Sequence, residues 1–491
     1  MQNTTKTPDD GGLRARLRAD WKWFLAITLA AFALRLFFIL CFPTITPDGY
    51  VYGDLAKNWL LHHVYGLSEP SGLAPTYIRL PGYPAFLALL WSLFGMEHYN
   101  AARWAQLLVD LGTCFITADL ARRLATIGGI SIGRVARWAF ALTALCPFLA
   151  NYTAVPLTET LSISLSALAL DFAVAALRQQ DAAGRLAAGS WVGCGLAIAA
   201  CIYLRPDGGI LLIAIGGYLL YRLARKPDQA RTIWAGVLLG ACALAPLAPW
   251  TLRNWRIFHQ FQPLAPLGAS APGEFAPRGF DRWMRTWLVD YASIEDIGFR
   301  VDGEPISVNA LPSRAFDTPQ ERDKTEELFE QYNENLEITP ALDAPFDELA
   351  RARIRRKPFR YCVELPVLRA LDLWFRPRTE LLPLDSHWWK FRQDPHDFAW
   401  SLLLALINLA YVALAILGLR RGRQLPYLGM LVGFPLVRTV LITLLAFPEP
   451  RYVLESYPVM MVLGAGVFGL QSSVFRRSSP DRTNVEAETG N

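Results

Sequence analysis

Acidic and arginine side chains lie at recurring positions beside the apolar runs of this sequence. Asp48 follows the first run, in TPDGYVYGDLAKN, and Glu159 precedes a later one, in VPLTETLS. The arginines in comparable positions are Arg79, Arg205, Arg253 and Arg451. A carboxylate can accept a hydroxyl proton or hold a cation, and a guanidinium group binds phosphate through several donors. This combination suits transfer from a lipid-linked phosphate to a hydroxyl group.

Three of these residues also have a structural explanation. Asp48 could cap a helix expected over 49–61, whose apolar residues form one stripe. Glu159 could be an acid in the first turn of a helix over 156–177, where the helix dipole stabilises negative charge. Arg205 could satisfy only its own tight loop. We favour catalysis for Asp48, and leave both interpretations of Glu159 open.

Other polar residues are candidates for the same cavity or have separate roles. Tyr83, Arg253 and Arg438 are cavity candidates, although an arginine beside tryptophans, as Arg253 is, also anchors chains at a membrane surface. Asp54 follows Asp48 by six residues, and a regular helix would turn it away, so we expect it to face solvent. Charges inside membrane spans are costly unless they are paired. We therefore expect Arg35 to pair with Asp110.

The composition is that of a polytopic membrane protein. Of the 491 residues, 53% are hydrophobic and 19% are charged. The sequence contains no basic cluster with interleaved aromatics that would indicate a nucleic-acid partner. About ten apolar runs have spanning length, near 22–42, 99–121, 135–153, 156–177, 186–204, 207–222, 232–250, 398–419, 425–446 and 453–471. The shorter run 81–95 fits a helix lying on the outer membrane surface.

The cationic residues in the short loops predict the topology. With the N-terminus in the cytoplasm, alternate short loops and the C-terminal tail collect the arginines on the inner side. The loop 43–98 then lies outside, with Lys57 and Arg79 as its cations. We therefore expect a multi-pass protein of the cytoplasmic membrane with both termini inside.

Five segments follow from this topology. They are a cytoplasmic tail 1–20, an N-terminal membrane region 21–260, an outer-side, mainly helical segment 261–397, C-terminal membrane helices 398–471 and a second cytoplasmic tail 472–491. Both polar tails have the composition of disordered chain. The predicted fold class is thus all-α and polytopic, with interfacial helices in the first outer loop and a smaller outer-side segment.

The order D…RLPGYP…TET…LRP…PWTLRNW…PEPRY resembles the GT-C glycosyltransferases. It is most similar to the branch with the protein O-mannosyltransferases and the bacterial aminoarabinose lipid A transferase. The resemblance covers about 20–260 and 400–470. Members of this family take sugar from a polyprenyl-phosphate donor on the outer side of the membrane.

The resemblance also implies roles for individual residues. Asp48 stands at the position of the catalytic carboxylate, and Glu159 at that of a second acid that binds a divalent metal or a polar substrate. Arg79 and Arg451 stand where family members place basic residues near the donor phosphate, and Arg205 is a further phosphate candidate. Some members carry adjacent acids in the first loop, whereas Gly49 follows Asp48 here.

The function expected from the sequence is inverting transfer of a hexose or pentose. The donor would be a polyprenyl-phosphate sugar, and the acceptor a hydroxyl of a cell-envelope lipid, polysaccharide or protein. The alternatives are a transporter or flippase of lipid-linked saccharides and a scaffold whose outer segment binds a partner. The identities of the sugar and of the acceptor do not follow from the sequence.

Overall fold

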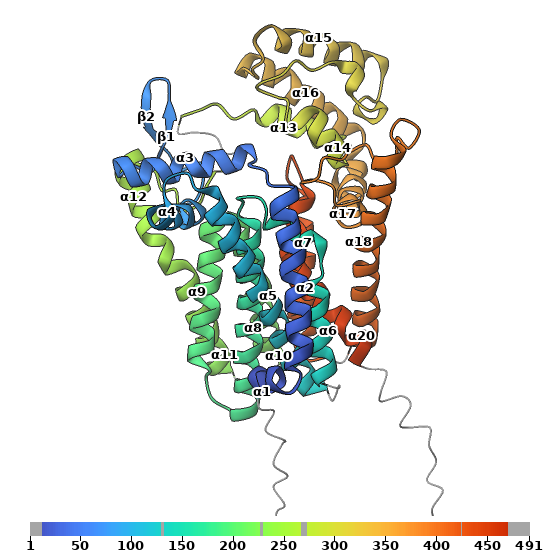
Figure 1. The fold of residues 1–491 in the computed structure, drawn as a ribbon. Coiled ribbons are helices and arrows are strands. Elements are labelled where there is room, and N and C mark those ends of the chain that lie inside the picture. Colours follow the sequence, from blue (N-terminus) through green and yellow to red (C-terminus); the bar gives the residue numbers. More distant parts are fainter. Residues whose placement is uncertain (1–11, 129–131, 226–228, 267–272, 424, 470–491) are drawn as a thin grey trace, which may run out of the picture.

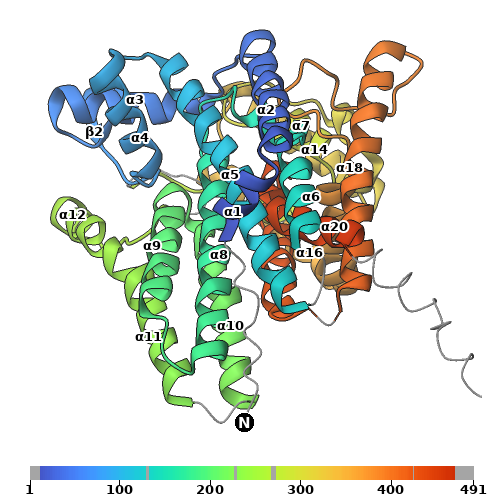
Figure 2. The same cartoon turned by 60° about the horizontal axis from the view of Figure 1, so that its bottom comes forward.

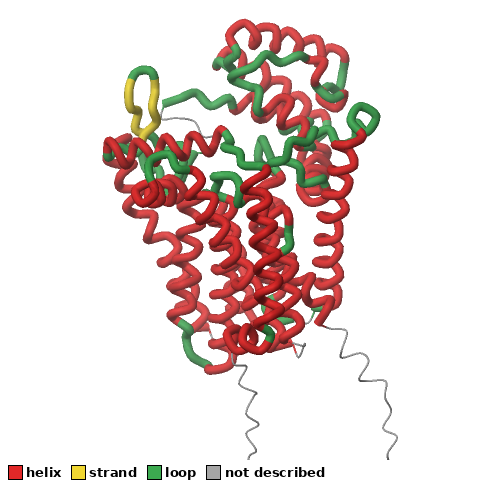
Figure 3. The backbone as a smooth tube through the Cα atoms, viewed as in Figure 1, coloured by secondary structure: helices red, strands yellow, loops and turns green. Residues whose placement is uncertain are grey.

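The computed structural model describes residues 12–128, 132–225, 229–266, 273–423 and 425–469. Helices dominate these residues (Figure 3). The strands among them form one antiparallel hairpin, β1 (Gly66–Glu69) and β2 (Gly72–Pro75), in which Gly66 pairs with Pro75.

Each of the ten apolar runs predicted from the sequence corresponds to a helix in the described residues. These helices are α2 (Trp21–Cys41), α5 (Tyr99–Gly128), α6 (Ile132–Ala144), α8 (Glu159–Ala183), α9 (Ala188–Leu204), α10 (Ile210–Arg225), α11 (Gln229–Leu244), α18 (Pro395–Arg421), α19 (Leu428–Thr443) and α20 (Tyr457–Gly469). Within the same residues, 6 helical stretches are long and apolar enough to cross a membrane. The helices run side by side (Figure 1), so the predicted all-α polytopic membrane fold is confirmed.

Short helices cover one end of this bundle. Helix α3 (Pro47–His62) lies across the helix ends, beside α4 (Gly82–Phe94) and near α12 (Ala248–Phe258) (Figure 1). Helix α4 is the run that was predicted to be interfacial. The remaining short elements are α1 (Gly12–Ala19), α7 (Pro147–Tyr152), η1 (Pro206–Gly209), η2 (Ala245–Leu247) and η7 (Pro450–Ser456).

The segment after α12 contributes a second unit on the same side as α3. It contains α13 (Arg278–Met284), α14 (Tyr291–Ser293), η3 (Ile294–Gly298), η4 (Val308–Ala310), η5 (Ser313–Ala315), α15 (Pro319–Asn335), α16 (Pro340–Arg356), η6 (Arg360–Glu364) and α17 (Leu365–Phe375). Its own core is rich in aromatic side chains, including Trp283, Trp287 and Phe329. The segment predicted to lie on the outer side therefore has a core of its own, apart from that of the helix bundle.

Helix α1 and the end of α20 lie at the other end of the bundle, as the two views of the ribbon show (Figures 1 and 2). The N-terminal tail differs from its prediction, because residues 12–19 form α1 rather than disordered chain. Leu13 and Leu17 are one helical turn apart and pack against the cluster around Phe24 and Phe140. The other tail residues, 1–11 and 470–491, lie outside the described residues.

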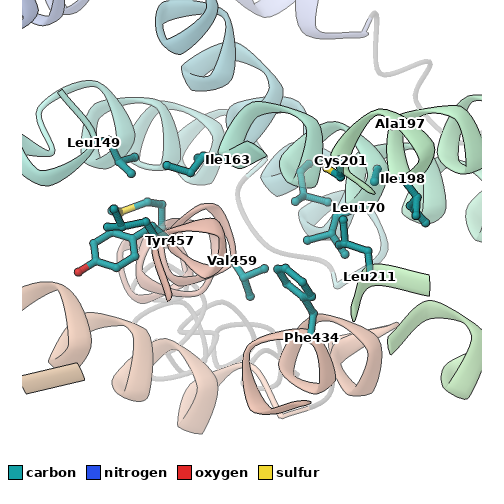
Figure 4. Packing of buried hydrophobic residues seen from close by; sticks show 14 of the residues in the cluster. Leu149, Ile163, Leu170, Ala197, Ile198, Cys201, Leu211, Phe434, Tyr457 and Val459 are labelled. Carbon is teal, nitrogen blue, oxygen red and sulfur yellow. The ribbon is translucent and has the colours of Figure 1, made fainter. Parts of the chain in front are cut away.

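The bundle core is formed by close packing of small and branched side chains. Ile163 and Leu170 of α8 lie near Ile198 of α9 and Val459 of α20 (Figure 4). In lipid such contacts act mainly through van der Waals packing, and small residues let helices approach closely. At Gly418, a Cβ atom would lie 1.8 Å from the carbonyl oxygen of Leu463, so α18 and α20 need glycine there.

A buried ion pair joins the first membrane helix to the second. Arg35 Nε donates to Asp110 Oδ2 over 2.6 Å, and Arg35 Nη1 donates to the Ala144 carbonyl over 2.6 Å. Both side chains are almost fully buried, at 0% and 1% exposure. The pairing expected from the sequence is therefore confirmed.

We predict that Arg35→Met or Asp110→Leu lowers the free energy of unfolding by about 3–5 kcal/mol, because each leaves one buried charge unpaired. The double variant should be more stable than either single variant. Thermal unfolding of the purified protein in detergent measures this coupling. Purely additive losses would show that the two charges do not depend on each other.

Candidate active site

The carboxylate of Asp48 lies between two arginines rather than at the end of its own helix. The N-cap of α3 is Thr46, whose Oγ1 accepts from the Gly49 amide over 3.2 Å. Asp48 Oδ1 instead accepts from Arg79 Nη2 over 2.8 Å, and Oδ2 accepts from Arg451 Nη2 over 3.0 Å. The capping interpretation of Asp48 is therefore wrong, because Thr46 already satisfies the helix start.

The two arginines come from loops that are distant in sequence. Arg79 follows the β1–β2 hairpin and precedes α4, whereas Arg451 lies in η7, directly before α20. Arg451 also donates to Glu449 Oε1 over 2.8 Å, and its Nε lies 3.6 Å from Glu159 Oε1. Arg451 thus connects Asp48 of α3 with two further acids.

Glu159 is the first residue of α8 and is fully buried. Its Oε1 accepts from Arg205 Nη1 over 2.9 Å. Arg205 follows α9, donates from Nε to Asp207 over 3.0 Å, and stacks 4.3 Å from the centroid of the Tyr452 ring. Glu159 therefore occupies the helix start and faces the arginine cluster as well.

A second layer holds the turn that carries Arg451. Arg438 of α19 is buried, and its Nη2 lies 2.6 Å from Asp207 Oδ2 and 2.7 Å from Glu455 Oε2. Its Nε donates to the Tyr452 carbonyl over 2.5 Å. Tyr452 Oη in turn donates to Glu449 Oε1 over 2.6 Å. These bonds fix the backbone beside Arg451.

The electrostatic balance at Asp48 favours the charged form. Burial raises the pKa of the Asp48 carboxyl, but the charges of Arg451 and Arg79 and their hydrogen bonds outweigh burial and hold it below its ordinary value. Burial and the charge of Asp48 raise the pKa of Tyr52 to about 12, so its phenol stays neutral at physiological pH. The free site therefore contains an ionised and weakly basic carboxylate.

The structure brings together most of the residues predicted from the sequence. Asp48, Arg79, Glu159, Arg205, Arg438 and Arg451 form one connected network. Two cavity candidates lie outside it. Arg253 donates to the Thr76 and Tyr65 carbonyls, each over 2.7 Å, and so anchors the hairpin loop. Tyr83 donates from Oη to Gln106 over 2.6 Å, in the core.

Asp54 differs from its prediction, because its carboxylate accepts from the Ser68 amide and hydroxyl over 2.7 and 2.8 Å. These hydrogen bonds attach the β1–β2 hairpin to α3, so the Asp54 carboxylate has a structural contact rather than solvent alone.

The network also contains Glu449, Tyr452 and Glu455, which all lie in FPEPRYVLES, around Arg451. Glu449 and Tyr452 stand beside Arg451 in the sequence, so their place in the stretch was the available signal. Glu455 was missed by the sequence analysis. It lies four residues beyond Arg451 and joins the network through Arg438.

A divalent cation, which the sequence suggests for Glu159, would need carboxylate oxygens that are free to coordinate it. Glu159 Oε1 is already engaged by Arg205 and approached by Arg451. In the described residues, one group of three potential ligands has donor atoms within 4.8 Å of one another. It consists of the exposed Asp394 and His396 and the partly buried Asp397, and does not include Glu159. The arginine-bound carboxylates do not fit a cation in this arrangement, and no chemical step below passes through one.

Comparisons with known proteins identify the fold. No family model matches the sequence, and no curated protein matches it. Among solved structures, the chain is similar to the oligosaccharyltransferase AglB from Archaeoglobus fulgidus, in complex with an inhibitory peptide and a dolichol-phosphate, with a TM-score of 0.50 and 11% identity. The match covers 93% of this chain and 50% of AglB, so the chain spans about half of that protein's length.

A second similar structure is ArnT from Cupriavidus metallidurans bound to undecaprenyl phosphate. Its TM-score is 0.37 and its identity 16%, over 91% of this chain and 77% of ArnT. The likeness to AglB and the helix order agree with the resemblance seen in the sequence. This chain has the fold of the part of AglB that it matches.

Proposed function

We propose that this protein is an inverting glycosyltransferase of the cytoplasmic membrane. It would move a sugar from a polyprenyl-phosphate donor to an acceptor hydroxyl on the outer face. The observation that carries the proposal is the Asp48 carboxylate in the first turn of α3, held between Arg79 and Arg451. A base and two phosphate-binding groups would then meet at one point, at the end of the bundle where such a donor would present its phosphate.

The donor phosphate would bind by exchange with Asp48. Arg79, Arg205, Arg438 and Arg451 face Asp48, Glu159, Asp207, Glu449 and Glu455. The cluster carries no surplus of positive charge, so an added phosphate competes with a carboxylate for guanidinium donors. Phosphate offers more acceptor oxygens and can hold both arginines through several bonds. Binding would thus release Asp48, whose proton affinity rises as the arginine charges turn to the phosphate.

The reaction would then be a single displacement. The acceptor oxygen attacks the anomeric carbon, the bond from that carbon to the phosphate oxygen breaks, and Asp48 takes the acceptor proton. The electron pair leaves on polyprenyl phosphate, whose charge Arg79 and Arg451 stabilise. Attack opposite the leaving group inverts the configuration. Arg205 and Glu159 would keep Arg451 oriented during this step.

An apolar cleft beside the arginine cluster supports a lipid-linked donor. It has a volume of about 670 Å³ and is lined by Ile202, Pro206, Gly209, Leu212, Leu244, Leu247, Ala248, Thr251, Leu252, Trp255, Phe261, Pro263 and Leu264. Pro206 lies between Arg205 and Asp207 of the network. A prenyl chain in this cleft would therefore begin next to the phosphate-binding groups.

We predict that Gly209→Trp raises the KM for a polyprenyl-phosphate donor roughly tenfold, which corresponds to about 1.4 kcal/mol. A Cβ atom at Gly209 meets nothing within 4 Å, so the indole can enter the cleft without disturbing the backbone. Gly217→Trp is the matched control, since Gly217 of α10 is equally open but does not line the cleft. Equal KM values for the two variants would place the donor tail elsewhere.

The decisive experiment uses purified protein with undecaprenyl-phosphate sugars and candidate acceptors. Release of undecaprenyl phosphate together with a glycosylated product supports the transferase. Movement of the intact donor across a vesicle membrane without release would support the flippase. If neither release nor movement occurs, the scaffold is the remaining alternative. Mass spectrometry of envelope lipids, polysaccharides and proteins from cells with and without the gene identifies the acceptor class. Repeating the assay with EDTA tests the divalent cation.

A further inference from the structure

A second buried polar group lies next to the proposed active site. After α17 the chain runs through residues 376–384, and Leu381, Leu382 and Leu384 pack against the core of the membrane helices. The segment therefore enters the end of the bundle, although the sequence placed it on the outer side. It brings three charged residues inward: Arg376 and Arg378 are each 4% exposed, and the Glu380 side chain is 9% exposed.

These side chains are held in place but are incompletely satisfied. Arg378 donates to the Pro450 carbonyl over 2.7 Å and to the Leu373 carbonyl over 2.9 Å. Arg376 donates from Nε to the Pro377 carbonyl over 3.0 Å. In the described residues, four buried atoms of this group have no hydrogen-bond partner: Arg376 Nη2, Arg378 Nε, Glu380 Oε1 and Tyr152 Oη. Buried polar atoms without partners are rare in native proteins and call for a specific explanation.

This polar group adjoins the phosphate-binding arginines. Tyr152 ends α7, and its phenol lies within electrostatic reach of Glu380, Tyr291, Glu159 and Arg451. Arg378 binds the carbonyl of Pro450, the residue directly before Arg451. A group attached to a phosphate at Arg451 could therefore reach Tyr152 and Glu380.

The balance of charge and of hydrogen-bonding atoms indicates what this group would bind. Arg378 Nη1 lies 3.6 Å from Glu380 Oε1, and Arg376 Nη1 lies 4.0 Å from Asp372 Oδ2, so each cation has a nearby anion. The unpartnered atoms comprise two N–H donors, one carboxylate acceptor and one hydroxyl. Hydroxyl groups of a neutral sugar both donate and accept, and they match this mixed set better than an anion does.

We infer that Tyr152, Arg376, Arg378 and Glu380 form the subsite for the neutral sugar carried by the donor. This inference rests on the proposed function, because the sugar would be attached to the phosphate held by Arg79 and Arg451. The subsite would select the sugar and orient its anomeric carbon towards Asp48. Of its four residues, Arg376, Arg378 and Glu380 lie outside the region where the sequence resembles the GT-C family.

The test compares two ligands on full-length protein in detergent. Affinity is measured for undecaprenyl phosphate alone and for undecaprenyl phosphate carrying glucose, mannose or arabinose. We expect at least one sugar-bearing ligand to bind wild type about tenfold more tightly than undecaprenyl phosphate. Tyr152→Phe and Glu380→Gln should each reduce that ratio about 2- to 10-fold, the range for one hydrogen bond. Both variants should bind undecaprenyl phosphate as wild type does.

Thermal stability separates a ligand role from a structural one. Because the Tyr152 hydroxyl has no hydrogen-bond partner among the residues that the structure describes, Tyr152→Phe should leave the melting temperature unchanged or higher. The matched control is Tyr427→Phe. The Tyr427 hydroxyl of the wild-type protein donates to Asp181 over 2.9 Å at the other end of the bundle. The control variant should lose stability and keep the ligand ratio.

The outcomes distinguish the two proposals. If wild type does not bind undecaprenyl phosphate, the proposed function fails. If wild type binds it but no sugar-bearing ligand binds more tightly, or if the ratio is unchanged in Tyr152→Phe and Glu380→Gln, the subsite is overturned and the function stands.

Discussion

Replacing Asp48 by asparagine is expected to lower the rate of sugar transfer by about 10²–10⁴-fold, the usual contribution of a positioned base. Asparagine has nearly the same shape and can still accept one hydrogen bond, so the fold around α3 should persist. It cannot take the proton of the acceptor hydroxyl. The rate constant for transfer should therefore fall, with expression and membrane insertion unchanged.

The same variant should bind donor phosphate at least as tightly as wild type. In the free protein Asp48 competes for Arg79 and Arg451, over 2.8 and 3.0 Å. Asparagine carries no charge, so the guanidinium groups become available to a phosphate. A loss of transfer with retained or tighter binding of undecaprenyl phosphate would show that Asp48 is the base and that it also competes with phosphate for the two arginines. A merely structural Asp48 would lose binding and stability together.

Asp54→Asn is the matched control for this substitution. Asp54 lies on the same helix and accepts from Ser68, and asparagine can still accept from the Ser68 amide. Transfer should stay within a fewfold of wild type. Transfer at the wild-type rate by Asp48→Asn would sink the assignment of the base.

Hydropathy predicted most of this fold because lipid imposes a strong local constraint. Each spanning segment must satisfy its backbone internally, so a spanning helix is visible as one apolar run. The arginines in alternate short loops then predicted which helix ends lie on the same side of the membrane. Helix α1 was not predicted because its arginines lower the hydropathy of a segment that has only two leucines. These leucines pack against the cluster that contains Phe24 and Phe140. In that case the stabilising contact is tertiary and leaves only a weak local signal.

The site was less predictable, because a side chain's partner comes from distant parts of the chain. Asp48 and Asp54 look alike in sequence, yet Asp48 meets Arg451, about 400 residues away, and Asp54 meets Ser68 in the adjacent hairpin. Arg253 and Arg205 also stand in similar contexts, and only Arg205 reaches the network. Glu380 was missed because the return of 376–384 into the bundle follows from packing of the outer-side unit, for which the sequence has no pattern.

Replacing Arg451 by glutamine is expected to lower kcat/KM by about 10²–10³-fold, the usual loss when a charge-stabilising donor is removed. Arg451 contacts Asp48, Glu449 and Glu159, so a neutral residue there weakens the donor site and the orientation of the base together. Arg451→Lys keeps the charge but loses the planar fork of donors. It should recover only part of the activity.

The pH profile separates these two roles of Arg451. Burial raises the pKa of Asp48, and the charge of Arg451, followed by that of Arg79, lowers it below the ordinary value near 3.8. Asp48 in the free wild-type protein therefore stays ionised in mild acid, and kcat/KM should fall little at that pH. In Arg451→Gln, burial is opposed less, so the pKa rises and activity should begin to fall at a higher pH. Arg451→Lys should keep the wild-type acid limb despite its lower rate, because the charge near Asp48 remains. An acid limb that is unchanged in Arg451→Gln would show that Arg451 does not act on the ionisation of the base, and that its effect is on the phosphate alone.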